Sequence, residues 1–199
     1  MKNGTLEFDE ASHTYRVDGR KVPGVTEVIR AFSPGFQASD WHKQRGIACH
    51  AAIALSNLGK LDWKSVDPAI AGRVRAWEKF RRDFGGTVIA VEKKLAHDMY
   101  LYAGTLDAAI ERKDGIVVVD AKSTVEDFVV WQLAAYAMLF TAKTKRSVRR
   151  VGAVRLADDE KYQCTWFDER EIAKAARQFL GMVTTFNALQ EYGITKGDR

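Results

Sequence analysis

The stretch GTLDAAIERKDGIVVVDAKST, residues 104–124, constrains the fold of this chain more than any other segment. Two strand-like runs flank Asp114-Gly115, a dipeptide typical of two-residue hairpin turns. The second run, IVVVDAKS, is apolar on the face opposite its charged residues, as expected of a strand that is covered on both sides of a sheet. We therefore expect this hairpin to form the centre of an α/β structure.

The same hairpin brings three ionisable side chains together. With Asp114-Gly115 as the loop, Asp107 would lie directly opposite Lys122 and diagonal to Asp120, all on one face. Two carboxylates at the end of a buried strand are costly unless they are paired or bind a metal, which favours an open Mg²⁺ site. An ordinary salt bridge between aspartate and lysine at the end of a sheet is the alternative.

Helices and strands are predicted on both sides of the hairpin in the chain. The expected N-caps of the first three helical segments are Thr26, Ser39 and Asp67, and Asp168 with Glu171 forms a capping box for the last helix. Expected helices cover residues 26–32, 41–59, 68–84 and 126–144 and a last segment from 169, and expected strands cover 87–97, 102–113, 115–123, 148–156 and 161–167. This order favours an α/β fold with a central mixed sheet and helices on both faces.

Composition narrows the class of protein. The 199 residues are 46% hydrophobic and 29% charged, which suits a single globular domain. We expect neither a membrane span nor a secretory signal, because no long apolar run occurs. Cys49 and Cys164 are too few for a disulfide framework or a four-cysteine metal site, and they favour a cytoplasmic protein. The net charge of +5 is compatible with a polyanionic partner.

Asp107 and the run Asp120-Ala121-Lys122 resemble the signature of the PD-(D/E)XK nuclease superfamily. That signature is an acidic residue in one strand, followed in the next strand by a carboxylate, any residue and a lysine. Leu106 stands where the signature has proline, a departure that the superfamily tolerates.

Three further segments resemble the RecB-like and phage-type exonuclease branch of this superfamily, in the expected order. RGIACH at residues 45–50 is similar to its RG-x-x-x-H segment, whose histidine is a metal ligand. Gln132 and Tyr136 match its Q-x-x-x-Y motif and lie one helical turn apart. The opening HTYRVDGRKVPGVTEVI is similar to the N-terminal segment of phage and prophage exonucleases.

The resemblance implies a restriction-endonuclease-like core within a single nuclease domain over residues 1–199. An N-terminal hairpin and short helix would occupy residues 1–36, and the catalytic core would occupy residues 86–157. The implied cofactor is one or two Mg²⁺ or Mn²⁺ ions, and with two cysteines we infer no iron–sulfur cluster.

Roles for individual residues follow from the resemblance. The implied metal ligands are His50, Asp107, Asp120 and the backbone carbonyl of Ala121, and the implied catalytic residues are Asp107, Asp120, Lys122, Gln132, Tyr136 and Glu92. Lys122 would orient or deprotonate a water, while Gln132 and Tyr136 would position the nucleic acid. For His50 and Glu92 the alternatives are a packed helix histidine and an exposed strand glutamate.

Contacts to nucleic acid form a second group of candidates. They are Arg45, Trp41, Gln132, Tyr136 and Ser123. Arginine binds phosphate oxygens in a bidentate manner, and an exposed tryptophan can stack on bases. A solvated helix arginine and ordinary surface residues are the alternatives.

The function implied is a metal-dependent deoxyribonuclease, an exonuclease of the phage type that acts in recombination or repair in a bacterial or phage-infected cell. Its partners would be DNA and, by analogy, a single-strand annealing or recombination protein, with no membrane. The alternatives are an endonuclease and a nuclease-fold module that binds DNA or a partner without cleavage. The oligomeric state stays open.

Overall fold

A computed structural model describes residues 4–33 and 40–194, with only the backbone described for Asp40, His42 and Lys43. Its elements are β1 (Leu6–Asp9), β2 (Thr14–Val17), β3 (Arg20–Val22), α1 (Val25–Phe32), α2 (Asp40–Asn57), a short 3₁₀ helix (Trp63–Ser65), α3 (Pro68–Phe84), β4 (Thr87–His97), β5 (Tyr102–Arg112), β6 (Gly115–Lys122), α4 (Val129–Thr144), β7 (Val148–Leu156), β8 (Tyr162–Phe167) and α5 (Glu169–Glu191). No described helix combines the length and hydropathy of a membrane span.

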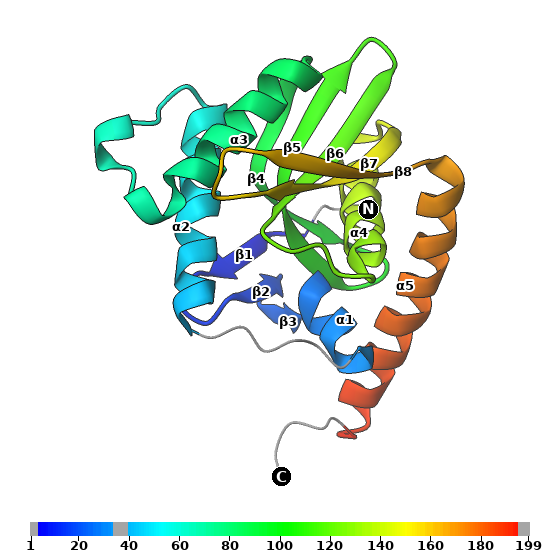
Figure 1. Cartoon of the computed structure of the whole chain (residues 1–199). Helices are drawn as coiled ribbons and strands as arrows, with labels where there is room; N and C mark the ends of the chain where they lie inside the picture. The colour runs from blue at the N-terminus through cyan, green and yellow to red at the C-terminus, as the bar shows by residue number, and fades with distance from the viewer. Residues whose placement is uncertain (1–3, 34–39, 195–199) are drawn as a thin grey trace.

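The central sheet has five strands in the order β4-β5-β6-β7-β8. Its pairs are antiparallel except for β6 and β7, which run parallel and are joined through α4. Buried residues of α1, α4 and α5 pack on one face, and those of α2 and α3 pack on the other (Figure 1). The predicted α/β class, with a mixed sheet between helices, is therefore confirmed.

A smaller antiparallel sheet, β1-β2-β3, precedes these layers. It joins the central sheet through Pro23, whose carbonyl accepts a hydrogen bond from the Ala103 N–H at 2.9 Å. The chain leaves this contact at Gly24, which caps α1 while its N–H donates to the Glu27 carboxylate. The expectation that Thr26 caps this helix is therefore wrong, because the cap lies two residues earlier.

The other predicted helix ends have mixed outcomes. Asp67 caps α3, and Asp168 with Glu171 forms the capping box of α5, as expected. Ser39 lies outside the described residues. α4 begins at Val129, three residues later than the expected start at 126, since a turn in which the Val129 N–H donates to the Glu126 carbonyl precedes it.

The hairpin turn differs from the prediction by one residue. Lys113 and Asp114 form the loop, while Gly115, with φ 126°, pairs with Arg112 as the first residue of β6. The ladder ends at Ala108 opposite Val119, so the next register position places Asp107 opposite Asp120 instead of Lys122. The pairing partner of Asp107 thus differs from the prediction by two residues, and the three ionisable residues stay together at the end of the ladder.

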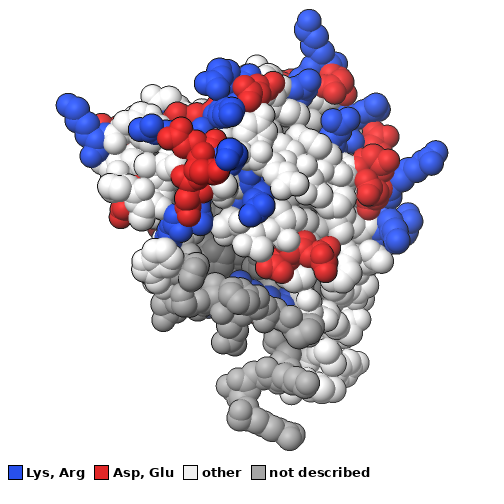
Figure 2. Space-filling model, in the orientation of Figure 1, with Lys and Arg blue, Asp and Glu red and all other residues white. Residues whose placement is uncertain are grey.

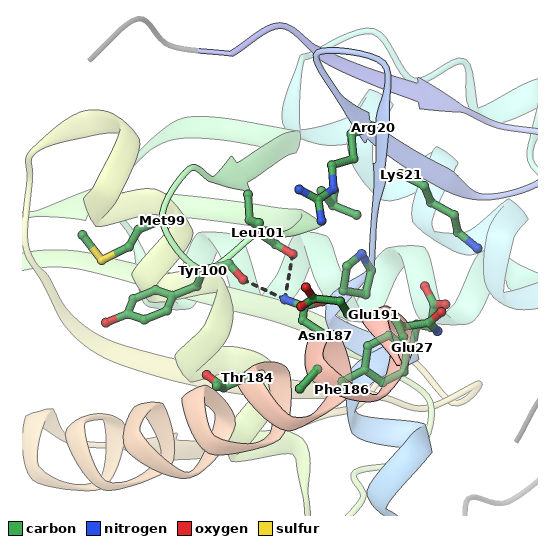
Figure 3. A pocket seen from close by; sticks show the side chains of 14 residues that line it. Arg20, Lys21, Glu27, Met99, Tyr100, Leu101, Thr184, Phe186, Asn187 and Glu191 are labelled. Carbon is green, nitrogen blue, oxygen red and sulfur yellow. Dashed lines mark hydrogen bonds between the residues drawn. The ribbon is translucent and has the colours of Figure 1, made fainter. Parts of the chain in front are cut away.

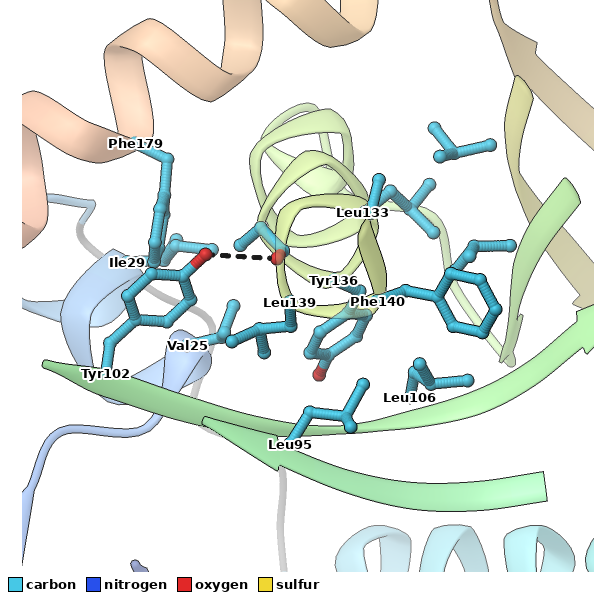
Figure 4. Packing of buried hydrophobic residues seen from close by; sticks show 14 of the residues in the cluster. Val25, Ile29, Leu95, Tyr102, Leu106, Leu133, Tyr136, Leu139, Phe140 and Phe179 are labelled. Carbon is cyan, nitrogen blue, oxygen red and sulfur yellow. Dashed lines mark hydrogen bonds between the residues drawn. The ribbon is translucent and has the colours of Figure 1, made fainter. Parts of the chain in front are cut away.

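Gly104 on β5 makes room for a buried aromatic ring. A Cβ atom at this position would lie 2.8 Å from a ring carbon of Tyr136 and 3.0 Å from a methyl carbon of Val25. Figure 4 shows the Tyr136 ring inside the cluster that α1, β5 and α4 form. The Tyr136 ring thus fits against a strand only because the strand carries no side chain there.

Replacing Gly104 with alanine is expected to lower the free energy of unfolding by about 1–3 kcal/mol, because the added methyl overpacks this site. Gly181→Ala in α5 is the matched control, since no atom lies within 4 Å of its Cβ position. Urea denaturation measures both variants. Equal stability of Gly104→Ala and the parent would contradict this packing.

Candidate metal centre

Three side chains with metal-ligating atoms converge from α2, β4 and β5. One ligand atom each of His50, Glu92 and Asp107 lies within 4.8 Å of the other two. His50 Nδ1 lies 3.2 Å from Asp107 Oδ2 and 3.9 Å from Glu92 Oε1. The neighbouring Cys49 is buried in the core beneath α2, which fixes the rotation of the helix. One imidazole and two carboxylates form a donor set that suits a divalent transition metal or Mg²⁺.

Glu92 enters this group through an irregularity in β4. Val91 pairs with Ala108 and Lys93 pairs with Leu106, but Glu92 between them has φ 42°, in the left-handed region. A non-glycine residue in this region is strained, and such strain is often found at functional sites. Burial, and next the Asp107 charge, raise the Glu92 pKa to about 7.

Asp107 is the hub of the group. Only 6% of the residue is exposed, and its Oδ2 accepts a hydrogen bond of 2.7 Å from the Ala121 N–H. Burial opposes charge on this carboxyl, but the His50 imidazolium, the Lys122 ammonium and the Ala121 N–H together outweigh it and lower the Asp107 pKa. In return, the Asp107 charge raises the pKa of His50 to about 9. The two groups therefore form an ion pair at neutral pH in the metal-free protein.

Asp120 and Lys122 complete the cluster from β6. The Lys122 Nζ atom lies 2.6 Å from Asp120 Oδ2, a buried oxygen that no aligned hydrogen bond satisfies. Burial, and then the nearby Asp107 charge, raise the Asp120 pKa to about 6. Burial opposes charge on Lys122, yet the charges of Asp120 and Asp107 together raise its pKa above the ordinary value. At neutral pH the lysine is thus an ammonium held against a carboxylate.

Gln132 and Tyr136 lie on the buried face of α4. The Gln132 Nε2 atom donates a hydrogen bond of 2.9 Å to the Tyr136 hydroxyl. Both residues are less than a tenth exposed. Burial, and next the Asp120 charge, raise the Tyr136 pKa well above its ordinary value, so the hydroxyl stays neutral. The pair thus lies in the electrostatic field of the cluster and does not face open solvent.

The remaining predicted residues lie at the rim. Arg45 Nε donates to the Ala69 carbonyl at 2.8 Å, and its guanidinium also bonds Asp158. Trp41 is 59% exposed and lies under the same guanidinium at 5.3 Å. Ser123 is exposed just after β6. Of these, Arg45 is already occupied by protein partners.

Two side chains near the cluster were not predicted from the sequence as site residues. The Tyr15 hydroxyl lies 2.8 Å from the Thr105 Oγ1 atom, which ties the N-terminal sheet to the strand that carries Asp107. Arg73 on α3 lines a small cavity beside His50. The helical pattern gave no signal for Arg73, because it is one of several arginines on α3.

The residues present fit a bound divalent cation. Glu92 Oε1 is a buried carboxylate oxygen without a hydrogen-bond partner among the described residues, although buried carboxylates are normally satisfied, and the buried Asp120 Oδ2 is paired with the Lys122 ammonium at 2.6 Å. Together with His50 and Asp107 they offer nitrogen and oxygen donors from four elements. A divalent cation would neutralise the negative charge of these carboxylates and bind their oxygens.

Metal affinity is expected to rise with pH between about 6 and 9. A histidine must be neutral to coordinate, so His50, with a pKa of about 9, must release a proton on metal binding at pH 7. Glu92, with a pKa of about 7, adds to the loss of affinity in acid. Calorimetric titration with Mn²⁺ in buffers of different ionisation enthalpy measures the protons released. Binding that is independent of pH would contradict this charge arrangement, and His50→Gln should remove the dependence above pH 7.

A separate cavity of about 700 Å³ lies between β3, the β4–β5 turn and the end of α5 (Figure 3). Asn187 on α5 links two sides of this cavity, because it donates hydrogen bonds to the carbonyls of Tyr100 and Leu101 in the β4–β5 turn. None of the predicted site residues lines it. Size alone therefore does not identify the functional site.

Comparison with solved structures places this architecture among known folds. A protein from Eubacterium rectale described as a "putative exonuclease" superposes with a TM-score of 0.53 over 83% of this chain and 72% of that chain, at 10% sequence identity. The two chains share a fold. The identity is too low to carry over residues or substrates.

Other comparisons add less. The alkaline exonuclease LHK-Exo of Laribacter hongkongensis aligns with a TM-score of 0.39 and 14% identity, over 85% of this chain and 92% of that chain. A complex of LHK-Exo with dAMP gives a TM-score of 0.40 and 15% identity, over 86% of this chain and 90% of that chain. TM-scores below 0.5 do not define a common fold. No protein-family model and no curated protein matches the sequence.

Proposed function

We propose that this chain is a metal-dependent deoxyribonuclease that hydrolyses DNA phosphodiester bonds. The observation that carries the proposal is the convergence of His50, Glu92 and Asp107 from three elements, beside Asp120 and Lys122 on the next strand. The shared fold with a protein described as an exonuclease supports it. We propose one nuclease domain over residues 1–199.

His50, Glu92, Asp107 and Asp120 would hold Mg²⁺ or Mn²⁺. The bound cation would act as a Lewis acid on the scissile phosphate. Ala121 contributes its N–H, which fixes the Asp107 carboxylate. The arrangement assigns Ala121 a supporting contact through nitrogen, while a role for its carbonyl stays a prediction.

Lys122 is best suited to stabilise negative charge. Its raised pKa keeps it protonated at neutral pH, so it would donate a hydrogen bond to the phosphate in the transition state. Asp120, with a pKa of about 6, is ionised at pH 7 and lies 2.6 Å from that ammonium. It would orient the attacking water and accept its proton.

Gln132 and Tyr136 would position the substrate strand. The Tyr136 hydroxyl already accepts a hydrogen bond from Gln132, so its own proton is free to be donated towards the site. Trp41 and Ser123 remain proposed contacts to nucleic acid at the rim.

Acidic and basic side chains alternate over the face in Figure 2, without a continuous basic surface there. A net charge of +5 therefore does not by itself define the DNA path. The motifs favour an exonuclease of the phage type that works in the cytoplasm in recombination or repair, beside an annealing protein.

Digestion of a linear duplex with one labelled 5′ end tests the exonuclease proposal. Covalently closed circles are incubated alongside, in Mg²⁺ or Mn²⁺. Progressive shortening of the linear DNA with intact circles is the expected result, and the label gives the polarity. Nicked circles would instead identify an endonuclease.

The second candidate is a module with this fold that binds DNA without cleavage. The tight pairing of Lys122 with Asp120 and of His50 with Asp107 is the observation that favours it, because both pairs satisfy charge without a metal. Calorimetry with Mn²⁺ separates the two. Absence of metal uptake would favour the binding module.

A further inference from the structure

A small cavity opens beside the metal centre, on the side of β6 that faces α2 and α3. Its volume is about 100 Å³, roughly the space of three water molecules at about 30 Å³ each. The charged or polar side chains on its wall are those of His50, Arg73, Lys122 and Ser123, and none of the described lining residues is acidic. A cavity with this lining favours a small anion.

Arg73 is held in place but keeps donors free. Its side chain is 15% exposed, and its Nε atom lies 2.8 Å from Asp158 Oδ1. Within the described part of the chain, its two terminal nitrogens have no hydrogen-bond partner. A guanidinium that is fixed through Nε presents its other N–H groups in a rigid fork, which matches phosphate oxygens.

Arg45 is in the opposite situation. Its Nε atom donates to the Ala69 carbonyl, and a terminal nitrogen bonds both that carbonyl and Asp158. The sequence made Arg45 the candidate phosphate contact, but its contacts link α2, α3 and the β7–β8 turn. Arg45 therefore holds these three elements together.

The β7–β8 turn reaches α3 closely enough to fix this geometry. A Cβ atom at Gly72 would lie 1.9 Å from the Asp158 carbonyl oxygen, so the turn rests directly on the helix backbone. Asp158 in turn bonds both Arg45 and Arg73. The position of Arg73 is thus set by two neighbouring elements before any ligand arrives.

We propose that Arg73, with Ser123 at the cavity mouth, forms an anion subsite that binds the DNA phosphate next to the scissile one. The cavity shares His50 and Lys122 with the metal centre and therefore lies directly beside it. The inference rests on the proposed nuclease function. Arg73 acts as a positioning residue whose charge fixes the register of the strand.

The test uses oligonucleotide duplexes in which one phosphate at a time, on either side of a single scissile bond, is a neutral methylphosphonate. Arg73→Gln is expected to raise KM about 10-fold or more and to change kcat less than about 3-fold, since a charge-assisted hydrogen bond is lost. A neutral linkage at one neighbouring position should raise the KM of the parent by the same factor and leave the KM of Arg73→Gln unchanged.

Two variants serve as controls. Arg75→Gln lies on the same helix, with a side chain that is 56% exposed and paired with Glu160, and should behave as the parent. Asp158→Asn keeps the Arg73 charge and a side-chain oxygen that can accept from the Arg73 Nε atom, so it should retain sensitivity to the neutral linkage. Retention of that sensitivity in Arg73→Gln would overturn the proposal.

Binding of the same duplexes in Ca²⁺, measured by fluorescence anisotropy, separates this proposal from the nuclease function itself. If the parent binds but does not cleave in Mg²⁺ or Mn²⁺, the proposed function fails while the subsite is still tested by the affinities. Equal affinity of parent and Arg73→Gln for every duplex would refute the subsite.

Discussion

Asp107→Asn is expected to reduce metal-dependent DNA cleavage by about 1,000-fold or more and to weaken Mn²⁺ binding by at least about 100-fold. The substitution keeps the size of the side chain and leaves an oxygen that can accept the Ala121 N–H. It removes the charge that lies 3.2 Å from His50 Nδ1 and next to Glu92. Cleavage assays and calorimetry measure the two effects.

A spectroscopic signature accompanies this loss. Because the Asp107 charge is the largest cause of the raised His50 pKa, that pKa should fall from about 9 towards the ordinary histidine value. NMR titration of the imidazole reports it without any substrate. Asp98→Asn is the control, since this half-exposed carboxylate pairs with Lys143 at the surface. Unchanged metal affinity in Asp107→Asn would rule out the aspartate as a ligand.

Lys122→Met is expected to lower kcat by about 100- to 10,000-fold while the protein still binds Mn²⁺. Methionine fills the space of the lysine but cannot stabilise negative charge on a phosphate. Removing the ammonium also takes away the positive charge that favours the ionised form of the buried Asp120 carboxyl, so the Asp120 pKa should rise above about 6. The acidic limb of the pH–rate profile should then move to higher pH.

The control for this variant is Lys161→Met, whose side chain is 78% exposed and pairs with Asp159. It removes the same charge far from the cluster and should leave kcat unchanged. If Lys122→Met cleaves as well as the parent, the lysine has no part in the chemistry and serves only as the partner of Asp120.

The central hairpin was predictable because its strands and turn carry local signals. Buried strands read as continuous apolar runs, and Asp114-Gly115 marks a turn. The register was not predictable, since Gly115 supplies a φ of 126° inside the strand instead of the loop. Asp107 still lies on the same face as Asp120, because the predicted pairing was wrong by two residues and side chains two residues apart on a strand share a face.

The site was predictable as far as side chains follow strand and helix periodicity. His50 and Glu92 were candidates from their motifs, yet nothing in the sequence shows that Glu92 adopts φ 42° and leaves the β4 ladder. The contacts that occupy Arg45 and position Arg73 depend on Asp158, which is more than 80 residues away along the chain. Such tertiary contacts have no local pattern.

The most direct test is cleavage of internally labelled linear duplex DNA by the parent and by Asp120→Asn, with Mg²⁺, with Mn²⁺ and with a chelator. Circular dichroism and Mn²⁺ calorimetry establish that both proteins are folded and whether each binds metal. Cleavage by the parent alone, and only with a divalent cation, is the predicted result. Intact DNA with a folded, metal-bound parent, or equal cleavage by Asp120→Asn, would contradict a metal-dependent nuclease centred on these residues.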